Sequence, residues 1–267
     1  MSRKIVITSG KGGVGKTTVT VNLGRALASF GERVLLIDID FGLNNLDVVL
    51  GLENKVVYDI FDIFEGRCRI RQAIINDDKY KNLSMISSGS RIDGAINSQN
   101  LRVIIDNIEG LYDFILLDCP AGIDAGFHRA ISCADEAIIV TTPTLTSVRD
   151  ADKVSTILRS YKLDKVSIIV NRARGDLIVN GKTLLPYDIK NILKTNLIGV
   201  LPEEDEVFLS TGYALSKTSD TYKAYKLLAE NVRKEKNKIY DVTQKYCGFI
   251  GSIRRAIKRN IWKKEMK

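Results

Sequence analysis

Short apolar runs recur along the chain and are separated by longer stretches in which apolar residues return every three or four positions. The apolar runs are continuous, as in strands that are buried on both faces of a parallel sheet. The stretches between them have the spacing of amphipathic helices. The predicted strands span residues 4–8, 33–38, 83–87, 113–118, 136–141, 166–171 and 197–201. This alternation predicts an α/β fold with a doubly wound, mostly parallel sheet.

Length and charge divide the chain into a body and a tail. The chain has 267 residues and 45% hydrophobic content, which is enough for one large domain and short for two. The formal net charge is +8, but seven basic residues and only one acidic residue lie between Tyr246 and Lys267. The body is therefore close to neutral, and we expect no specific nucleic-acid binding. We predict one domain over residues 1–241, followed by a tether and a helix over 242–267.

Several classes of protein are excluded by what the sequence contains. The first strand begins within a few residues of the N-terminus, with no apolar signal segment, so we expect a cytoplasmic protein. No apolar run approaches the length of a transmembrane helix. The single histidine, His128, excludes a histidine metal cluster or a serine triad. The cysteines are widely separated and are expected to be reduced thiols: Cys68, Cys119, Cys133 and Cys247.

A glycine-rich segment follows the first predicted strand and precedes a predicted helix. The spacing from Gly10 through Gly15 to Lys16 is typical of a phosphate-binding loop, in which backbone N–H groups converge on phosphate oxygens. Lys16 is placed to neutralise the β and γ phosphates, and the Thr17 hydroxyl to bind Mg²⁺. An ordinary glycine-rich turn is the alternative, but the order of strand, loop and helix favours a nucleotide triphosphatase. The residues expected to contact nucleotide are Gly10, Lys11, Gly12, Gly13, Val14, Gly15, Lys16, Thr17 and Thr18.

Three aspartates lie at the ends of two predicted strands. Asp38 ends the predicted strand at 33–38, and Asp40 follows it by two residues. Asp118 ends the predicted strand at 113–118. An apolar strand that ends in aspartate is typical of the Walker B arrangement, in which the carboxylate holds Mg²⁺ or its water shell. We expect Asp118 to bind the metal through water, Asp40 to orient the attacking water beside the metal, and Asp38 to support both. The sequence leaves open which of Asp38 and Asp40 touches the water, and each aspartate taken singly could be a helix cap.

Longer stretches resemble one family of ATPases. Lys11 to Thr18 reads Lys-Gly-Gly-Val-Gly-Lys-Thr-Thr, the signature of the deviant Walker A class of P-loop proteins. Narrower matches lie at residues 40–47, 56–59, 118–123, 134–137 and 147–152. On these motifs the chain resembles the MinD family of division-site ATPases over nearly its whole length. The alternatives within the class are a ParA-like DNA partition ATPase and a FlhG-like regulator of flagellar number.

The resemblance implies ligands and partners. Members of the family bind ATP with Mg²⁺ and dimerise on ATP, because Lys11 of one subunit reaches the nucleotide of the other. A cation supplied in this way accelerates phosphoryl transfer by about a thousandfold or more. Asn171 matches the family's adenine-reading position, although a turn residue at a strand end has the same signature. The resemblance also implies a division inhibitor, MinC, and often a hydrolysis stimulator, MinE, near the helix after Ser147, a region where Thr144 replaces an acidic residue.

The tail has one apolar and one basic side when it is placed on a helix of about 3.6 residues per turn. This pattern predicts an interfacial helix that binds anionic lipids, with its apolar residues in the membrane. An isolated helix of this length is marginal in water, so we expect it to form on a surface. A helix docked on the body is the alternative, whereas the MinD family ends in a membrane-targeting helix on the cytoplasmic face. The residues expected to contact lipid are Phe249, Ile250, Ile253, Arg254, Ile257, Lys258 and Ile261.

Overall fold

A computed structural model describes residues 2–42, 44–89, 96–209 and 212–265, without the side chains of 208, 209 and 258–265. Its centre is an eight-stranded sheet in the order β3-β4-β2-β5-β1-β6-β7-β8. The strands are parallel except for the edge strand β3, which pairs antiparallel with β4. Their bounds are β1 Arg3–Thr8, β2 Val34–Asp38, β3 Ile75–Asn76, β4 Leu83–Ile86, β5 Phe114–Asp118, β6 Glu136–Thr141, β7 Lys165–Ala173 and β8 Asn196–Pro202.

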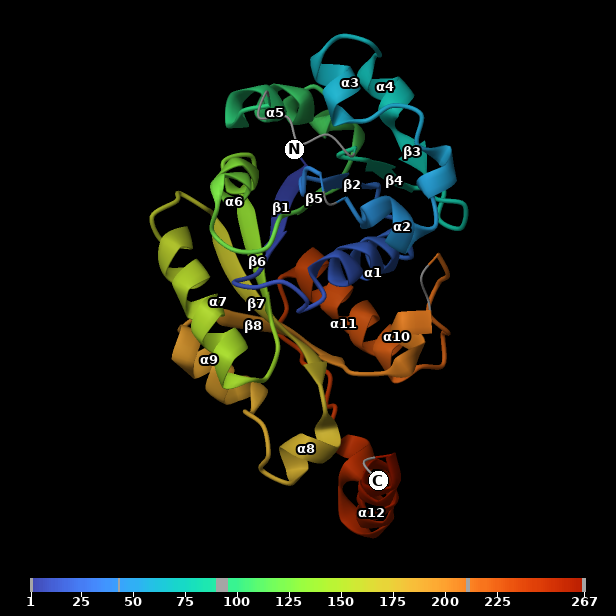
Figure 1. The fold of residues 1–267 in the computed structure, drawn as a ribbon, viewed down its shortest axis with the longest axis vertical. Helices are drawn as coiled ribbons and strands as arrows, with labels where there is room; N and C mark the ends of the chain where they lie inside the picture. Colours follow the sequence, from blue (N-terminus) through green and yellow to red (C-terminus); the bar gives the residue numbers. More distant parts are fainter. Residues whose placement is uncertain (1, 43, 90–95, 210–211, 266–267) are drawn as a thin grey trace.

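Helices cover both faces of the sheet, as Figure 1 shows. One apolar core lies between the sheet and helices α1 and α11. The other lies between the opposite face of the sheet and helices α5, α6, α7 and α9. The bounds of these helices are α1 Lys16–Ala28, α5 Ser98–Asp106, α6 Ala125–Ile131, α7 Leu145–Leu158, α9 Pro186–Leu193 and α11 Asp220–Lys234. The shorter helices are α2 Leu46–Leu50, α3 Ile60–Phe64, α4 Ile70–Ala73, α8 Gly175–Val179 and α10 Asp205–Leu209. The doubly wound fold predicted from the sequence is confirmed.

The seven predicted strands coincide with seven of the eight observed, to within two residues at each end. The eighth, β3, is only two residues long and was not predicted, because so short a segment has no periodicity to detect. β1 lies between β5 and β6 in the sheet, and the order of connection reverses there. Ligands of doubly wound sheets bind outside the carboxyl ends of the strands at such a reversal. The fold therefore places the loop after β1 at the expected ligand site.

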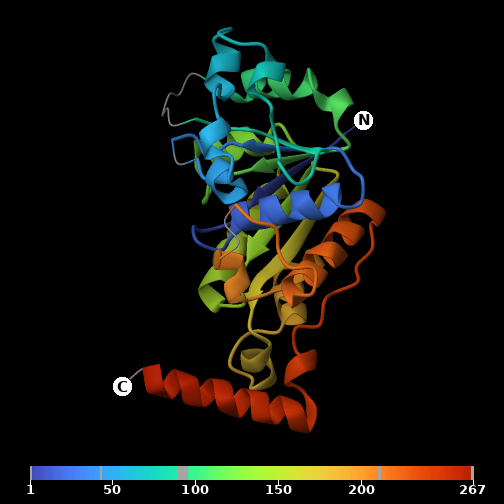
Figure 2. The same cartoon turned by 90° about the vertical axis from the view of Figure 1, so that its right-hand side faces the viewer.

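The tail forms a helix, α12 Gly248–Glu265, that projects from the end of the body (Figures 1 and 2). We expected this helix to form only on a surface, but the structure ties its first turns to the chain before it. Arg254 Nη1 donates to the carbonyl oxygen of Lys245 at 3.3 Å, and Arg255 donates to that of Tyr246. The backbones meet at Gly251, where an added Cβ would lie 2.2 Å from the Tyr246 carbonyl carbon.

Among the residues that the structure describes, no helix combines the length and the apolar content needed to cross a membrane.

Candidate nucleotide site

The loop between β1 and α1 has a backbone that only glycine adopts easily. Gly13 and Gly15 have φ values of 78° and 93°, and Gly15 is the N-cap of α1. At Gly10 an added Cβ would lie 2.4 Å from the backbone of Asp150 in α7, so the loop needs glycine there to approach that helix. Nothing lies within 4 Å of an added Cβ at Gly12. The loop therefore packs against α7 at Gly10 and has open space beside Gly12, and it leads into the N-terminus of α1.

The first turns of α1 and the end of β5 are joined by hydroxyl groups. The Thr17 hydroxyl donates to Asp118 Oδ2 at 2.6 Å, and the Thr20 hydroxyl donates to Oδ1 at 2.9 Å. Thr20 was not predicted from the sequence, although it lies three residues after Thr17 and hence on the same face of α1. Lys16 is only 9% exposed at the start of this helix. The structure therefore brings together Lys16, Thr17 and Asp118 as the sequence predicts.

Asp38 lies beside Asp118, because these two residues are paired in register on β2 and β5. Its Oδ1 accepts from the N–H of Asp40 at 2.9 Å, and its Oδ2 accepts from the N–H groups of Asn45 and Leu46 at 3.2 Å each. Asp38 thus organises the start of α2. Asp40 is only half-buried, and no side-chain hydrogen bond of its carboxylate is recorded among the described residues.

The electrostatics of this pair are unfavourable to two charges. Burial, followed by the charge of Asp118, raises the pKa of Asp38 to about 8. Burial also raises the pKa of Asp118 to about 6, although hydrogen bonding from Thr17 and the charge of Lys16 oppose it. The pKa of Asp40 is raised by burial as well, against the charge of Lys16. Three carboxyl groups with raised pKa values at one phosphate loop favour the binding of a cation there.

Lys11 lies on the rim of the loop, next to α7. Its Nζ is 3.5 Å from Thr146 Oγ1, and its carbonyl oxygen accepts from the Ser9 hydroxyl at 2.8 Å. α7 begins beside it, where the Thr144 hydroxyl accepts from the N–H of Ser147. Thr144 therefore serves as an N-cap, a role that an acidic side chain also performs. The Lys11 side chain is partly exposed.

A cavity of about 130 Å³ adjoins the loop at the carboxyl ends of β7 and β8. Asn171 lies at its wall and donates from Nδ2 to the carbonyl oxygen of Val14 at 2.8 Å. An added Cβ at Gly15 would lie 2.5 Å from the same nitrogen, so the contact requires glycine. The residues after β8 were not predicted, since no sequence pattern joins them to the loop. The cavity is lined by Gly15, Thr18, Asn171, Arg172, Pro202, Glu203, Glu204 and Val207.

The comparisons with known proteins agree with this site. The model of the AAA domain family matches residues 2–170. The septum site-determining protein MinD of Synechocystis is 45% identical over 212 residues, which cover 79% of this chain and 80% of that protein. The chain belongs to the MinD family. The resemblance predicted from the sequence motifs is thereby confirmed.

Two solved structures of the MinD family show how closely the fold is shared. The chain matched in a MinC:MinD cell division protein complex from Aquifex aeolicus has a TM-score of 0.82 and 41% identity, covering 88% of this chain and 97% of that one. MinD from Pyrococcus horikoshii, complexed with Mg-ADP, has a TM-score of 0.79 and 32% identity, covering 88% and 97%.

Proposed function

We propose that this chain is a Mg²⁺-dependent ATPase that pairs on ATP, adsorbs to the cytoplasmic face of the membrane and recruits a division inhibitor that positions the septum. Residues 1–241 form the ATPase, and residues 242–267 form the tether and the membrane helix. The observation that carries the proposal is the pairing of the phosphate loop with Asp118 in a member of the MinD family. MinD of Pyrococcus horikoshii, with 32% identity, is complexed with Mg-ADP, which supports the same ligands here.

The loop geometry fits a nucleotide with its metal. The N–H groups of Gly13, Gly15 and Lys16 would bind phosphate oxygens at the positive end of α1, and Lys16 would balance their charge. Thr17 and Asp118, which are already hydrogen-bonded to each other, would hold Mg²⁺, Thr17 through its hydroxyl and Asp118 through water. The metal neutralises charge on the β and γ phosphates when it is bound. Asn171 and the adjoining cavity would receive the base.

Asp38 ends β2 and Asp40 follows it, and of these two carboxylates we assign the orientation of the attacking water to Asp40. Asp38 already accepts three backbone hydrogen bonds, whereas Asp40 is more accessible. Asp40 would therefore orient the attacking water and stand next to the metal, with Asp38 holding the loop that carries it. Lys11 of the partner subunit would complete the charge balance, as an arginine finger does.

The membrane helix has a suitable orientation for adsorption. Phe249, Ile253 and Ile257 lie on one ridge of α12 and are exposed, as is Ile250. Gly251 contacts Tyr246, whose ring lies against Gly175 of the body. Gly251 is offset by two positions from the ridge, so the apolar side faces away from the body. Arg254 contacts its own chain at Lys245, while the side chains of Lys258 and Ile261 lie outside the described residues.

A division inhibitor is the partner that the family suggests. MinD of Aquifex aeolicus, 41% identical, is complexed with MinC, and we propose the same class of partner here. A MinE-type stimulator would act near the start of α7, where Leu145 is exposed beside Thr146 and Lys11. An exposed apolar side chain next to the interfacial lysine would let a partner sense the paired state.

Sedimentation with anionic vesicles tests this function. The wild-type chain should pellet with phosphatidylglycerol vesicles in the presence of a non-hydrolysable ATP analogue, and Lys16→Ala should abolish the nucleotide dependence. Ile257→Glu should prevent pelleting, because it places a charge on the apolar ridge, while Ser252→Glu makes a matched charge change off that ridge. Unchanged pelleting of Ile257→Glu would refute the membrane helix. Retention of DNA without retention of lipid would favour partition instead.

A further inference from the structure

Pro202, at the end of β8, lies between two cavities. On one side is the cavity of about 130 Å³ beside Asn171 and Gly15. On the other is a cavity of about 220 Å³, lined by Pro202, Asp220, Tyr240, Asp241, Val242, Gln244 and Lys245. Five of the seven residues that line the second cavity lie between Tyr240 and Lys245, where the body passes into the tether that leads to α12. The segment that closes the proposed base cavity is therefore in contact with the root of the membrane helix.

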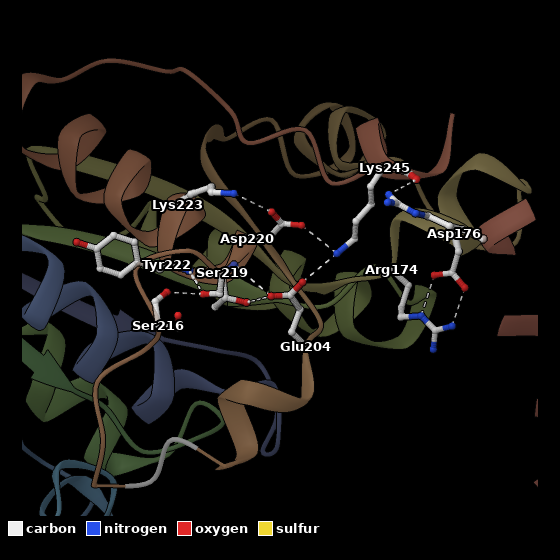
Figure 3. Close-up of polar contacts among 11 residues, drawn as sticks. Arg174, Asp176, Glu204, Ser216, Ser219, Asp220, Tyr222, Lys223 and Lys245 are labelled. Atoms are coloured by element: carbon white, nitrogen blue, oxygen red, sulfur yellow. Dashed lines mark hydrogen bonds and ion pairs between the residues drawn. The ribbon is translucent and has the colours of Figure 1, made fainter. Parts of the chain in front are cut away.

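Lys245 joins these two regions directly, as Figure 3 shows. Its Nζ lies 2.9 Å from Glu204 Oε1 and 3.0 Å from Asp220 Oδ2. Glu204 lines the base cavity, and its Oε2 accepts from the Thr221 hydroxyl at 2.8 Å. One lysine thus holds a carboxylate of the cavity wall and a carboxylate of the first turn of α11.

The ion pair is more than a loose surface contact. The side chains of Lys245 and Glu204 are 34% and 22% exposed, and two carboxylates converge on one ammonium. Burial tends to raise the pKa of Glu204, but hydrogen bonds from Lys245 and Thr221 hold it below its usual value. Burial opposes the charge of Lys245, yet Glu204 and Asp220 raise its pKa overall. Networks of this kind resist rearrangement better than isolated exposed pairs.

The turn that carries Lys245 also sets the direction of α12. Residues Gln244–Tyr246 form a 3₁₀ turn, and the helix begins two residues later at Gly248. The carbonyl oxygens of Lys245 and Tyr246 accept hydrogen bonds from Arg254 and Arg255 of α12. A displacement of the turn would therefore rotate the apolar ridge of α12 as well.

We propose that Lys245 is a positioning residue that links the base cavity to the posture of the membrane helix within a single chain. This inference rests on the proposed function of both sites. A base in the cavity holds Glu204 in the position in which it binds Lys245, and that ion pair holds the turn that directs the apolar ridge away from the body. Binding at the two sites is then mutually reinforcing. Because linkage is reciprocal, lipid bound at α12 tightens nucleotide by the same factor.

Nucleotide affinity with and without membrane tests this link. A fluorescent ADP analogue is titrated into the full-length chain, alone and with saturating phosphatidylglycerol vesicles. ADP is used because the proposed pairing needs ATP, so the effect of a second subunit is absent. Vesicles should tighten the wild-type Kd by about fivefold. Lys245→Met and Glu204→Gln should each abolish this difference, whereas Lys223→Met, which removes another partner of Asp220, should retain it.

The outcomes separate the link from the function on which it rests. An equal Kd with and without vesicles, in a wild-type chain that binds both, overturns the link and leaves the ATPase and the membrane helix intact. A vesicle effect that survives in both Lys245→Met and Glu204→Gln also overturns it. A wild-type chain that binds no ADP, or that binds no vesicle even with a non-hydrolysable ATP analogue, overturns the proposed function and the link together. Thermal unfolding of each variant verifies that it is folded.

Discussion

Two carboxyl groups, Asp38 and Asp118, meet across neighbouring strands with little access to water. A buried charge is stabilised only by partners, and Asp118 has the Thr17 and Thr20 hydroxyls while Asp38 has backbone N–H groups. Hydrogen bonds alone leave both pKa values raised. The site is therefore strained electrostatically until a cation enters, which favours a metal-loaded nucleotide over an unloaded one.

The raised pKa of Asp38 makes stability depend on pH. The folded chain holds a proton on this group up to about pH 8, whereas the unfolded chain releases it near its usual value of 3.8, so the free energy of unfolding falls as pH rises between them. Asp38→Asn has no such proton. The free energy of unfolding of Asp38→Asn, relative to that of wild type, should therefore rise with pH. The rise should be about 1.4 kcal/mol per pH unit over the range in which Asp38 is protonated in the folded chain and ionised in the unfolded chain.

Urea unfolding of both nucleotide-free proteins at several pH values between 5 and 9 measures this difference. The asparagine amide loses part of the hydrogen bonding to Asn45 and Leu46, but that loss is the same at every pH. Parallel stability curves would show that Asp38 is ionised in the folded chain throughout.

At the scale of elements, strands and loop were predictable and the contacts between them were not. The apolar runs from Val34 to Asp38 and from Phe114 to Asp118 predict strands because both faces are buried. Thr17 and Asp118 lie 101 positions apart, and the phosphate-loop and Walker B motifs predicted that they meet at one metal, but not that they are directly hydrogen-bonded. Lys245 and Glu204 are joined only by the fold. The site residues of the loop and strand ends were predictable, including Gly15, Thr18 and Asn171 of the base cavity, but the part of the cavity wall that follows β8 was not.

The direction of α12 depends on a close backbone contact at Gly251. A side chain there would collide with Tyr246, so Gly251→Val should separate the start of α12 from the turn at Gln244–Tyr246 and expose this segment to solvent. Tryptic cleavage at Lys245 and Arg255 should then be about fivefold faster, as expected for a local loss of about 1 kcal/mol. Ala256→Val on an exposed position of the same helix is the matched control. Equal cleavage rates for the two variants would contradict the importance of this contact.

At the scale of the whole molecule, the phosphate loop and α1 lie against the sheet, whereas α12 extends beyond the end of the body (Figures 1 and 2). Each single helix is expected to adsorb weakly, because its apolar ridge is short. Two helices joined through a nucleotide-dependent pair bind one surface at high effective concentration, which raises the combined affinity by about a hundredfold or more. In the proposed function, control of pairing is therefore control of the time that the chain spends on the membrane.

Lys11 should be the residue on which pairing depends. Lys11→Ala removes the cation that we propose completes the partner subunit's site but leaves Lys16 and Thr17 in place, so one chain should still bind nucleotide. Light scattering with a non-hydrolysable ATP analogue should show dimers for wild type and single chains for Lys11→Ala. Lys182→Ala, an exposed lysine outside the loop, should behave as wild type. Dimers of Lys11→Ala at the same protein concentration would remove the basis for coupling through this lysine.

The apolar ridge of α12 faces away from the body, and the helix runs across the long axis of the molecule (Figure 2). A chain adsorbed through that ridge would stand upright on the bilayer, with α3, α4 and α5 as its most distant part. An upright molecule has a small footprint, so lipid area limits crowding less than it would for a chain lying flat. If the chain adsorbs as proposed, this geometry favours dense layers of upright molecules with α3, α4 and α5 facing the solvent.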